Sequence, residues 1–191
     1  SNYLPEAYAA ARAAGGVCIA DEVQTGFGRT GEHYWGFQSS GVVPDIVTMA
    51  KGIGNGFPLS AVIVRRDIAE AMAVRSFMST MGSNPTCCAA GRGVMAALDS
   101  GGLQENARRV GVEALKMFGE LQQRHEVVGD VRGSGLMIGV EIVKDRKTKE
   151  PATELVAKIA DEISDSVIIT KAGPYANVIR LVPPLCLTVQ D

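Results

Sequence analysis

Two apolar runs in the sequence end in side chains that can do acid–base or nucleophilic chemistry. The run GVCIADEV contains Asp21 and Glu22 near its end, and the run DIVTMA leads directly into Lys51. In open α/β sheets, ligands bind at the carboxyl ends of the strands. A carboxylate and a lysine at one such edge form either a structural ion pair or a catalytic pair, and spacing alone favours the ion pair.

The backbone that follows Lys51 is rich in glycine, with Gly52, Gly54 and Gly56 at alternate positions. Glycine adopts backbone conformations that other residues avoid, and it leaves room for a ligand to approach the chain closely. A lysine that is partly desolvated in such a place can act as an amine nucleophile. The glycines therefore keep the catalytic interpretation of Lys51 open.

The elements that would position these residues alternate between short apolar runs and helical stretches. We predict strands at 16–23, 45–50 and 60–64, each with the continuous apolar character of a buried parallel strand. A helix rich in small residues is predicted at 85–98. This alternation predicts an α/β layered fold.

A pair of glycines, Gly101 and Gly102, marks a predicted domain boundary. We predict that residues 1–100 are half of a larger α/β domain and that 101–191 form a smaller α+β domain. Apolar residues spaced by three and four predict a long amphipathic helix at 103–121. Further elements of this domain are predicted as a strand at 136–143, a helix at 153–163, and strands at 167–170 and 178–182. Because LTVQD reads as the start of another helix, we expect the domain to be incomplete at its end.

The composition argues against several other classes of protein. With 19 basic and 21 acidic residues, the formal net charge is −2, so the chain lacks the basic stripe of a nucleic-acid binder. No apolar run reaches the roughly 18 residues that a membrane span needs. The four cysteines do not have the spacing of a zinc site, and His33 and His125 are isolated. We therefore predict reduced thiols and no metal site, and neither a nucleic-acid nor a membrane partner.

The segments around Asp21 and Lys51 resemble those of class III (omega-type) aminotransferases, which depend on pyridoxal 5'-phosphate (PLP). IADEVQTGFGRTG resembles their cofactor strand, and PDIVTMAKGIGNGFPLSAV resembles the segment with the lysine that binds the cofactor. The resemblance continues through STMGSNP, GDVRGSGLMIGVE and VIRLVPPLC and covers essentially the whole chain. It implies the PLP-dependent transferase fold type I: residues 1–100 would be the C-terminal half of the large mixed-sheet domain, and 101–191 most of the small C-terminal α+β domain.

The resemblance implies roles for four residues of the first half. Lys51 would hold the cofactor covalently through its aldehyde and then move a proton at the substrate α carbon. Asp21 would pair with the pyridine nitrogen and keep the ring protonated, so that the ring can accept electrons. Val23 would pack on the ring face, although plain strand core is the alternative for it. Gln24 would hydrogen-bond the ring hydroxyl.

Thr80 matches a threonine that, in the family, reaches the cofactor phosphate of the neighbouring subunit. This match implies a homodimer or homotetramer with a shared active site, while an ordinary turn residue is the alternative. Met81 and Ser83 stand where the family more often has an aromatic residue and glycine, so the conformation of this loop is open.

Arg180 matches the arginine that binds the substrate carboxylate. A planar guanidinium can make a two-pronged bond to a carboxylate, although an exposed strand arginine is the alternative. Arg29 and Arg132 lie in glycine-rich turns, where we predict structural roles for them.

Within the family, LQEN and NVIRLVPPLC resemble the mitochondrial branch that moves an amino group from alanine to glyoxylate. The implied function is PLP-dependent transamination of an amino acid or omega-amino acid to a keto acid, in mitochondria or otherwise in the cytoplasm. A PLP-dependent phospho-lyase of a phosphorylated amine and a truncated, non-catalytic chain are the alternatives. The family's phosphate-binding turn and its ring-stacking aromatic would precede Ser1, so we expect a fragment that binds the cofactor poorly alone.

Overall fold

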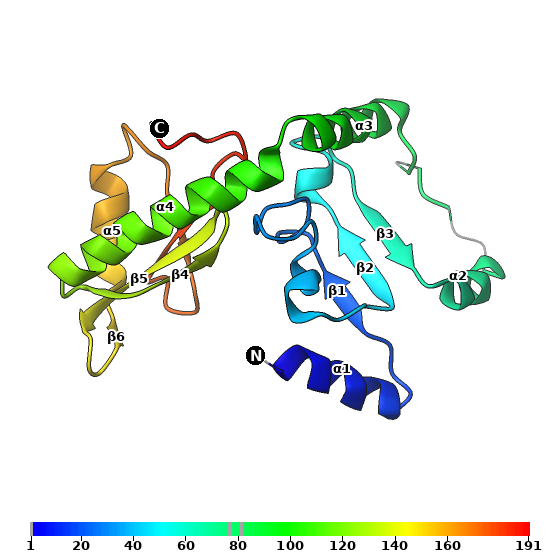
Figure 1. Ribbon diagram of the computed structural model, residues 1–191, viewed down its shortest axis with the longest axis horizontal. Helices are drawn as coiled ribbons and strands as arrows, with labels where there is room; N and C mark the ends of the chain where they lie inside the picture. The colour runs from blue at the N-terminus through cyan, green and yellow to red at the C-terminus, as the bar shows by residue number, and fades with distance from the viewer. Residues whose placement is uncertain (1, 76–77, 81) are drawn as a thin grey trace. The chain divides into compact units, whose positions relative to one another are not determined.

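The computed structural model folds the chain into two compact units (Figure 1). The first unit comprises Ser1–Arg29 and His33–Gln104, and the second comprises Thr30–Glu32 and Glu105–Asp191. The residues that the structure describes are 2–75, 78–80 and 82–191. Ser1 and Met81, which entered the sequence-based expectations, lie outside the described residues. Each unit is described by itself.

The first unit is built on a three-stranded sheet in the order β1-β2-β3. The strands β1 (Ile19–Asp21) and β2 (Ile46–Met49) are parallel, whereas β3 (Ala61–Val64) runs antiparallel to β2. The sequence predicted a buried parallel strand at 60–64, and this prediction was wrong in direction. The connection from β2 holds only the short 3-10 helix η2 (Lys51–Ile53). A parallel return needs a longer crossover, so β3 turns back beside β2.

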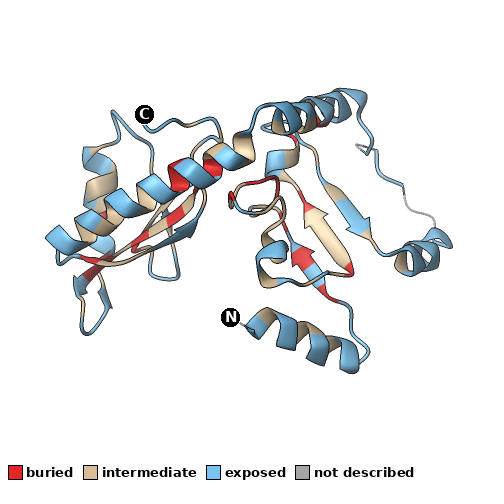
Figure 2. Cartoon of the chain, viewed as in Figure 1, coloured by how far each residue is buried: buried red, intermediate tan, exposed pale blue. Residues whose placement is uncertain are grey.

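Burial in the first unit is concentrated at the ends of the strands and in the loop after β1 (Figure 2). Cys18, Ala20, Phe27 and Met49 are buried. By contrast, Ile19 is 55% exposed, and Val62 on the same sheet face is 60% exposed. The prediction that all three runs are buried along their length is therefore wrong for this chain.

The first unit also contains three α-helices: α1 (Tyr3–Ala13) precedes the strands along the chain, and α2 (Arg66–Ala73) and α3 (Pro85–Ser100) follow them. The side chain of Asn84 caps α3 by accepting hydrogen bonds from the backbone N–H groups of its first turn. Proline at the first helical position needs no hydrogen-bond acceptor there, so Pro85 suits this start. The predicted helix at 85–98 is thus present and extends to Ser100, and an ordered cap fixes where it begins.

A buried carboxylate ties α1 to the sheet at the end opposite Lys51. Asp45, directly before β2, accepts a hydrogen bond from the backbone N–H of Cys18 at 2.8 Å. Its other partners are the guanidinium groups of Arg12 at 3.2 Å and Arg65 at 2.6 Å. The N–H of Cys18, followed by Arg12, lowers the pKa of Asp45. Buried charges need such partners, so Asp45 is an anchor of this unit.

The second unit contains a sheet in the order β4-β5-β8-β7, with β6 paired to β5. All of its pairings are antiparallel. Its helices are α4 (Leu103–Arg124), whose first two residues belong to the first unit, and α5 (Thr153–Glu162). The strands are β4 (Val128–Ser134), β5 (Met137–Asp145), β6 (Glu150–Pro151), β7 (Thr170–Ala172) and β8 (Val178–Leu181).

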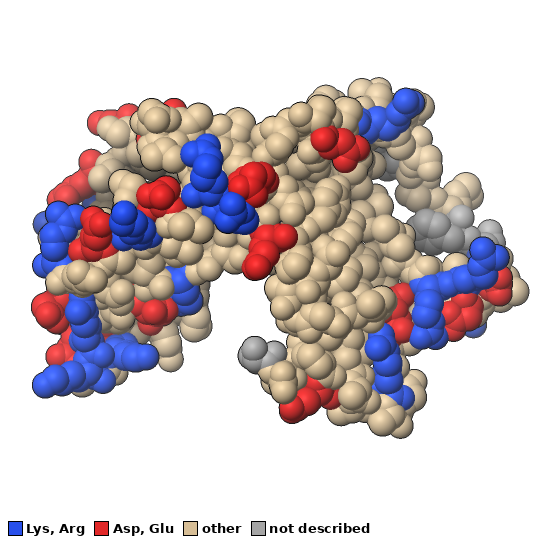
Figure 3. All heavy atoms as spheres, in the orientation of Figure 1, with Lys and Arg blue, Asp and Glu red and all other residues tan. Residues whose placement is uncertain are grey.

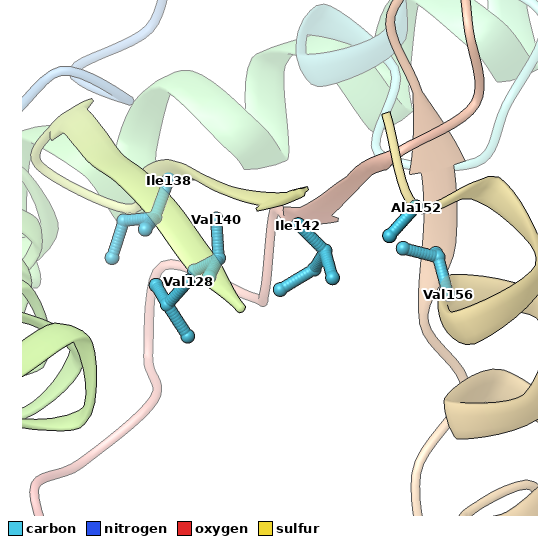
Figure 4. Packing of buried hydrophobic residues seen from close by; sticks show 6 residues of the cluster. All are labelled: Val128, Ile138, Val140, Ile142, Ala152 and Val156. Atoms are coloured by element: carbon cyan, nitrogen blue, oxygen red, sulfur yellow. The ribbon is translucent and has the colours of Figure 1, made fainter. Parts of the chain in front are cut away.

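The core of the second unit lies between one face of this sheet and its helices. Alternate strand residues, including Ile138, Val140 and Ile142, pack with Val128 and with Val156 of α5 (Figure 4). Ala114, Leu115 and Phe118 of α4 pack against the same cluster. Because side chains alternate along a strand, the opposite face is left for polar residues.

The strand predicted at 167–170 forms three residues later than expected. The backbone N–H groups of Ser166 and Val167 still bond to the carbonyl of Ile163, so the turns that follow α5 continue to that point. Strand pairing with β8 begins at Thr170. This turn at the end of the helix therefore displaces the strand, which runs from Thr170 to Ala172.

Charged side chains of both signs lie side by side on the surface drawn in Figure 3. Several form ion pairs, such as Arg108 with Glu105 at 2.6 Å and Lys144 with Glu150 at 2.8 Å. Within residues 2–75, 78–80 and 82–191, no helix is both long and apolar enough to cross a membrane.

Candidate active site

Asp21 occupies the last position of β1, directly opposite Thr48 of the parallel strand β2. One carboxylate oxygen, Oδ1, accepts the backbone N–H of Val23 at 3.1 Å and faces the hydroxyl of Thr48 at 3.4 Å. Asp21 is exposed, so its carboxylate is accessible to a ligand. The two donors give its carboxylate a defined orientation at the edge of the sheet.

Lys51 lies just beyond the end of β2, at the same edge of the sheet as Asp21. Its φ is +44°, in the left-handed region that residues other than glycine rarely adopt. The carbonyl of Lys51 accepts the N–H groups of Gly54 at 3.2 Å and Asn55 at 3.0 Å, and these bonds hold the turn. Local strain of this kind is found at functional sites.

The structural ion pair that the spacing had favoured is not formed. In the described part of the chain, the Lys51 ammonium has no carboxylate within 4.0 Å. Lys51 is also exposed, so it is not desolvated in this chain. Its amine is therefore exposed and, among the described residues, has no carboxylate partner, so it is available for a ligand.

Glu22 faces the opposite way from Asp21, because consecutive side chains alternate across a strand. It is only 3% exposed. Its carboxylate accepts three hydrogen bonds: from the hydroxyl of Thr25 at 2.7 Å and from the backbone N–H groups of Gly36 and Phe37 at 2.8 Å each. Glu22 thus closes the loop that follows β1. Sequence reasoning missed this role, although the alternation rule signals that Asp21 and Glu22 face opposite ways.

An aromatic cluster fills the loop that Glu22 closes. Phe27 packs edge-to-face against Tyr34 and Trp35, with ring centroids 5.8 Å and 5.2 Å apart. Phe27 also touches the residue after the candidate lysine, since a Cβ built on Gly52 would lie 3.2 Å from its ring. The loop after Asp21 and the turn at Lys51 therefore support each other through Phe27 and Gly52.

Tyr34 extends this cluster toward α3. Its hydroxyl lies 3.3 Å from the sulfur of Met95. Burial, with a smaller contribution from the charge of Asp99, raises the pKa of Tyr34 above its ordinary value. The phenol accordingly stays neutral at physiological pH and serves as a packing group.

The other predicted cofactor residues of the first unit differ in their placement. Val23 and Gln24 are half-buried in the turn that begins after Asp21, so they lie at the candidate edge. Thr80 is exposed in a turn ahead of α3 in which Gly82 N–H bonds to the carbonyl of Ser79. No hydrogen bond among the described residues joins Thr80 to this edge.

Arg180 belongs to the second unit, on β8, and is half-buried there. Its Nε donates to the hydroxyl of Thr170 at 3.2 Å, and no carboxylate of the described residues lies within 4.0 Å. Arg132, for which a structural role was predicted, instead pairs with Asp130 at 2.6 Å and Glu141 at 2.7 Å. The positive charge of Arg132 is thus neutralised by carboxylates, whereas that of Arg180 is available to a ligand.

The first unit therefore brings Asp21, Val23, Gln24 and Lys51 to one edge of its sheet. Within the described ranges, no group of three or more His, Cys, Asp or Glu side chains is placed to hold a metal ion. Among the described residues, the chemical groups at this edge are the oriented carboxylate of Asp21 and the primary amine of Lys51, which has no carboxylate partner there. Such a pair suits a ligand with a basic ring nitrogen and a carbonyl carbon open to attack.

Comparison with known proteins identifies the family. The profile of the family described as "Aminotransferase class-III" matches residues 1–191, so the chain belongs to this family. It is 50% identical over 191 residues to alanine–glyoxylate aminotransferase 2 homolog 2, mitochondrial, of Arabidopsis thaliana, covering 100% of this chain and 40% of that protein. The human mitochondrial alanine–glyoxylate aminotransferase 2 is 47% identical over 98% of this chain and 37% of its own length.

Other relatives carry a different name. Ethanolamine-phosphate phospho-lyase homolog 1 of Caenorhabditis elegans is 41% identical over 97% of this chain and 41% of its own length. The chain thus spans about 40% of the length of the curated relatives it matches.

Solved structures confirm the fold as that of PLP-dependent transaminases, fold type I. A phospholyase from Arthrobacter superposes with a TM-score of 0.92 at 37% identity, over 97% of this chain and 44% of that one. An aminotransferase from Bacillus anthracis gives 0.92 at 34%, over 99% and 45%. An amine transaminase of an uncultivated Pseudomonas species, solved in a PLP-bound form, gives 0.85 at 37%, over 99% and 44%.

Proposed function

We propose that this protein catalyses PLP-dependent transamination between an amino acid or omega-amino acid and a keto acid, with alanine as donor and glyoxylate as acceptor. The observation that carries the proposal is the placement of Asp21 and Lys51 at the carboxyl ends of adjacent parallel strands, in a chain of the class III aminotransferase family. The named activity of the alanine–glyoxylate relatives, at 47–50% identity, supports this donor and acceptor.

The residues at the edge fit the cofactor. PLP has a pyridine nitrogen, which a carboxylate keeps protonated, and an aldehyde, which a primary amine can attack. Asp21 offers an exposed carboxylate already oriented by two donors. Lys51 offers an exposed amine that has no carboxylate partner within the part of the chain that the structure describes. Gly52 and Gly56 leave the adjacent backbone without side chains.

PLP, when bound, supplies the electron sink that stabilises negative charge at the substrate α carbon. Lys51 would hold the cofactor covalently through Nζ. Once released by the amino group of the substrate, Nζ of Lys51 would move the proton between the substrate α carbon and the former aldehyde carbon of the cofactor. Asp21 would keep the ring nitrogen protonated throughout.

Val23 and Gln24, in the turn after β1, would also contact the cofactor ring. Val23 is half-buried, and its apolar side chain suits contact with a ring face. Gln24 is half-buried too, and its amide can hydrogen-bond the ring hydroxyl. Thr80 would reach the cofactor phosphate of a neighbouring subunit, and its exposure on a turn is compatible with that role. We accordingly propose a homodimer or homotetramer with shared active sites.

Arg180 would bind the substrate carboxylate, and the absence of a carboxylate partner among the described residues supports this. We further propose that residues 1–100 are the C-terminal half of the large domain and that 101–191 belong to the small C-terminal domain. A mitochondrial location is proposed from the names of the relatives.

A second candidate function is elimination of phosphate from a phosphorylated amine. It is favoured by the phospho-lyase names of one curated relative and of one solved structure with a TM-score of 0.92. The same lysine and cofactor would serve both reactions. A non-catalytic role for the chain is the third candidate.

Cofactor trapping tests the proposal directly. The protein from the complete reading frame is incubated with PLP, reduced with borohydride, digested and examined by mass spectrometry. We expect the label on Lys51 alone and none in Lys51→Ala, whereas label spread over many lysines would contradict the site. Formation of pyruvate from alanine and glyoxylate, against release of phosphate from phosphoethanolamine, then separates the two reactions.

A further inference from the structure

One face of the sheet in the second unit carries a row of residues in direct cross-strand register. Arg132 of β4 is opposite Gly139 of β5, Gly139 is opposite Arg180 of β8, and Arg180 is opposite Thr170 of β7. Directly opposed residues point to the same side of a sheet. The neighbours Val140 and Ile179 point to the core, so this row lies on the face away from it.

The two arginines of the row are in different electrostatic states. Arg132 lies between the carboxylates of Asp130 and Glu141, at 2.6 Å and 2.7 Å. Arg180 has no carboxylate within 4.0 Å among the described residues. Gly139 separates them and places no side chain between them. The uncompensated positive charge of the row is therefore that of Arg180.

The hydroxyl of Thr170 makes two hydrogen bonds to Arg180. It donates to the Arg180 carbonyl at 3.2 Å, and it accepts the Nε–H of the same residue at 3.2 Å. A hydroxyl can donate and accept at once, so both bonds form together. They fix the guanidinium relative to its own backbone and occupy the Nε donor.

We propose that Thr170 is a positioning residue that presents the Nη1 and Nη2 edge of Arg180 to the carboxylate of the substrate. This inference rests on the proposed role of Arg180. A guanidinium can bind a carboxylate through both Nη groups or through Nε and one Nη. With Nε held by Thr170, only the first mode is open. Thr170 therefore sets the orientation, and with it the affinity, for substrates that carry a carboxylate.

The test uses the PLP-loaded protein from the complete reading frame. Thr170→Val removes the hydroxyl at nearly constant shape, and Thr170→Ser keeps it. Thr153→Val is the matched control, because the Thr153 hydroxyl also donates to a backbone carbonyl, that of Tyr175 at 2.6 Å, but has no bond to Arg180. KM and kcat are measured for alanine and for ethylamine, which is alanine without its carboxylate. Propionate, alanine without its amino group, serves as competitive inhibitor.

We expect Thr170→Val to raise the KM for alanine and the Ki for propionate about fivefold, the scale of one lost hydrogen bond, with little change in kcat. Values for ethylamine should not change, and Thr170→Ser and Thr153→Val should behave like the parent protein. An equal loss with alanine and ethylamine, or an unchanged Ki for propionate, would overturn the inference. Where ethylamine turns over too slowly, the Ki decides.

Arg180→Ala, measured in parallel, separates two kinds of failure. If it weakens propionate binding and Thr170→Val does not, only the role of Thr170 is wrong. If Arg180→Ala leaves propionate binding unchanged, the proposed carboxylate site itself is wrong, and the role of Thr170 is overturned with it.

Discussion

The buried carboxylate of Glu22 offers a direct way to test how the loop after Asp21 is held in place. Its two oxygens accept three hydrogen bonds, from Thr25, Gly36 and Phe37, at 2.7–2.8 Å. Glu22→Gln keeps the size of the side chain but replaces one acceptor oxygen with an NH2 group. That group can only donate, so it meets at least one donor of the loop without forming a bond.

The expected cost follows from the number of bonds lost. If the remaining amide oxygen takes the position of Oε2, it keeps the bonds from Thr25 and Gly36 and loses the one from Phe37. Leaving such a donor unpaired costs about 1–3 kcal/mol. For a protein of this size, a loss of about 2 kcal/mol lowers Tm by about 4–8 °C. In the opposite orientation the bond from Phe37 is kept and the one from Gly36 is lost, whereas the Thr25 hydroxyl can turn to accept from the NH2 group, so the cost is similar.

Thermal unfolding followed by circular dichroism measures this cost, and fluorescence reports on the loop itself. Trp35 is the single tryptophan of the sequence and packs in the aromatic cluster of this loop. Glu22→Gln should therefore shift its emission as well as lower Tm. Glu70→Gln makes the same chemical change at an exposed position of α2 and serves as control. Equal Tm values and emission spectra for the two variants would refute the reasoning.

Four further predictions concern the site and its framework. Lys51→Ala should abolish turnover in a transamination assay, because no other amine lies at this edge in the described structure; retained turnover would contradict the assignment. Asp21→Asn should still retain PLP but slow α-proton removal, seen as a larger isotope effect with α-deuterated substrate, and an unchanged rate would exclude it as the ring partner. Folding lowers the pKa of Asp45, so the Asp45 carboxylate stabilises the fold fully above the unfolded pKa of about 3.9 and loses this effect as pH falls through the unfolded and then the folded pKa. The free energies of unfolding of the parent and of Asp45→Asn, measured by urea titration, should therefore converge below this pH range. A difference that stays constant with pH would contradict this. Gly111→Ala would place a Cβ in steric clash with the Gly135 carbonyl oxygen, so we expect roughly 1–3 kcal/mol of destabilisation by urea unfolding, and wild-type stability would contradict the close packing.

The common edge of Asp21 and Lys51 could be predicted from the sequence, because it depends only on where two strands end. Parallel neighbours bring their carboxyl ends to one side of a sheet whatever their packing. The long helices were predictable for a similar reason. Their periodic apolar residues and end signals, such as the cap at Asn84, are local.

Other features depend on contacts between distant segments, and the predictions made from the sequence were wrong for them. The apolar character of Ile19 and Val62 predicted burial, but both are more than half exposed in this chain. The hydrophobicity of a residue indicates how much free energy its burial would provide, but it does not indicate which segment of the protein buries it. The direction of β3 likewise depends on the length of the connection from β2, which apolar periodicity does not report.

The conformation of Lys51 shows why chemistry can be hidden from sequence patterns. At φ +44° a glycine would be the favoured residue, and a lysine there costs roughly 1–2 kcal/mol. Glycine carries no amine, so under the proposed function the position must accept the strain. The surroundings offset it: Gly54 and Asn55 bond to the Lys51 carbonyl, and Phe27 packs against Gly52. In the sequence, the strained turn is therefore indicated by the glycines next to Lys51 and not by Lys51 itself.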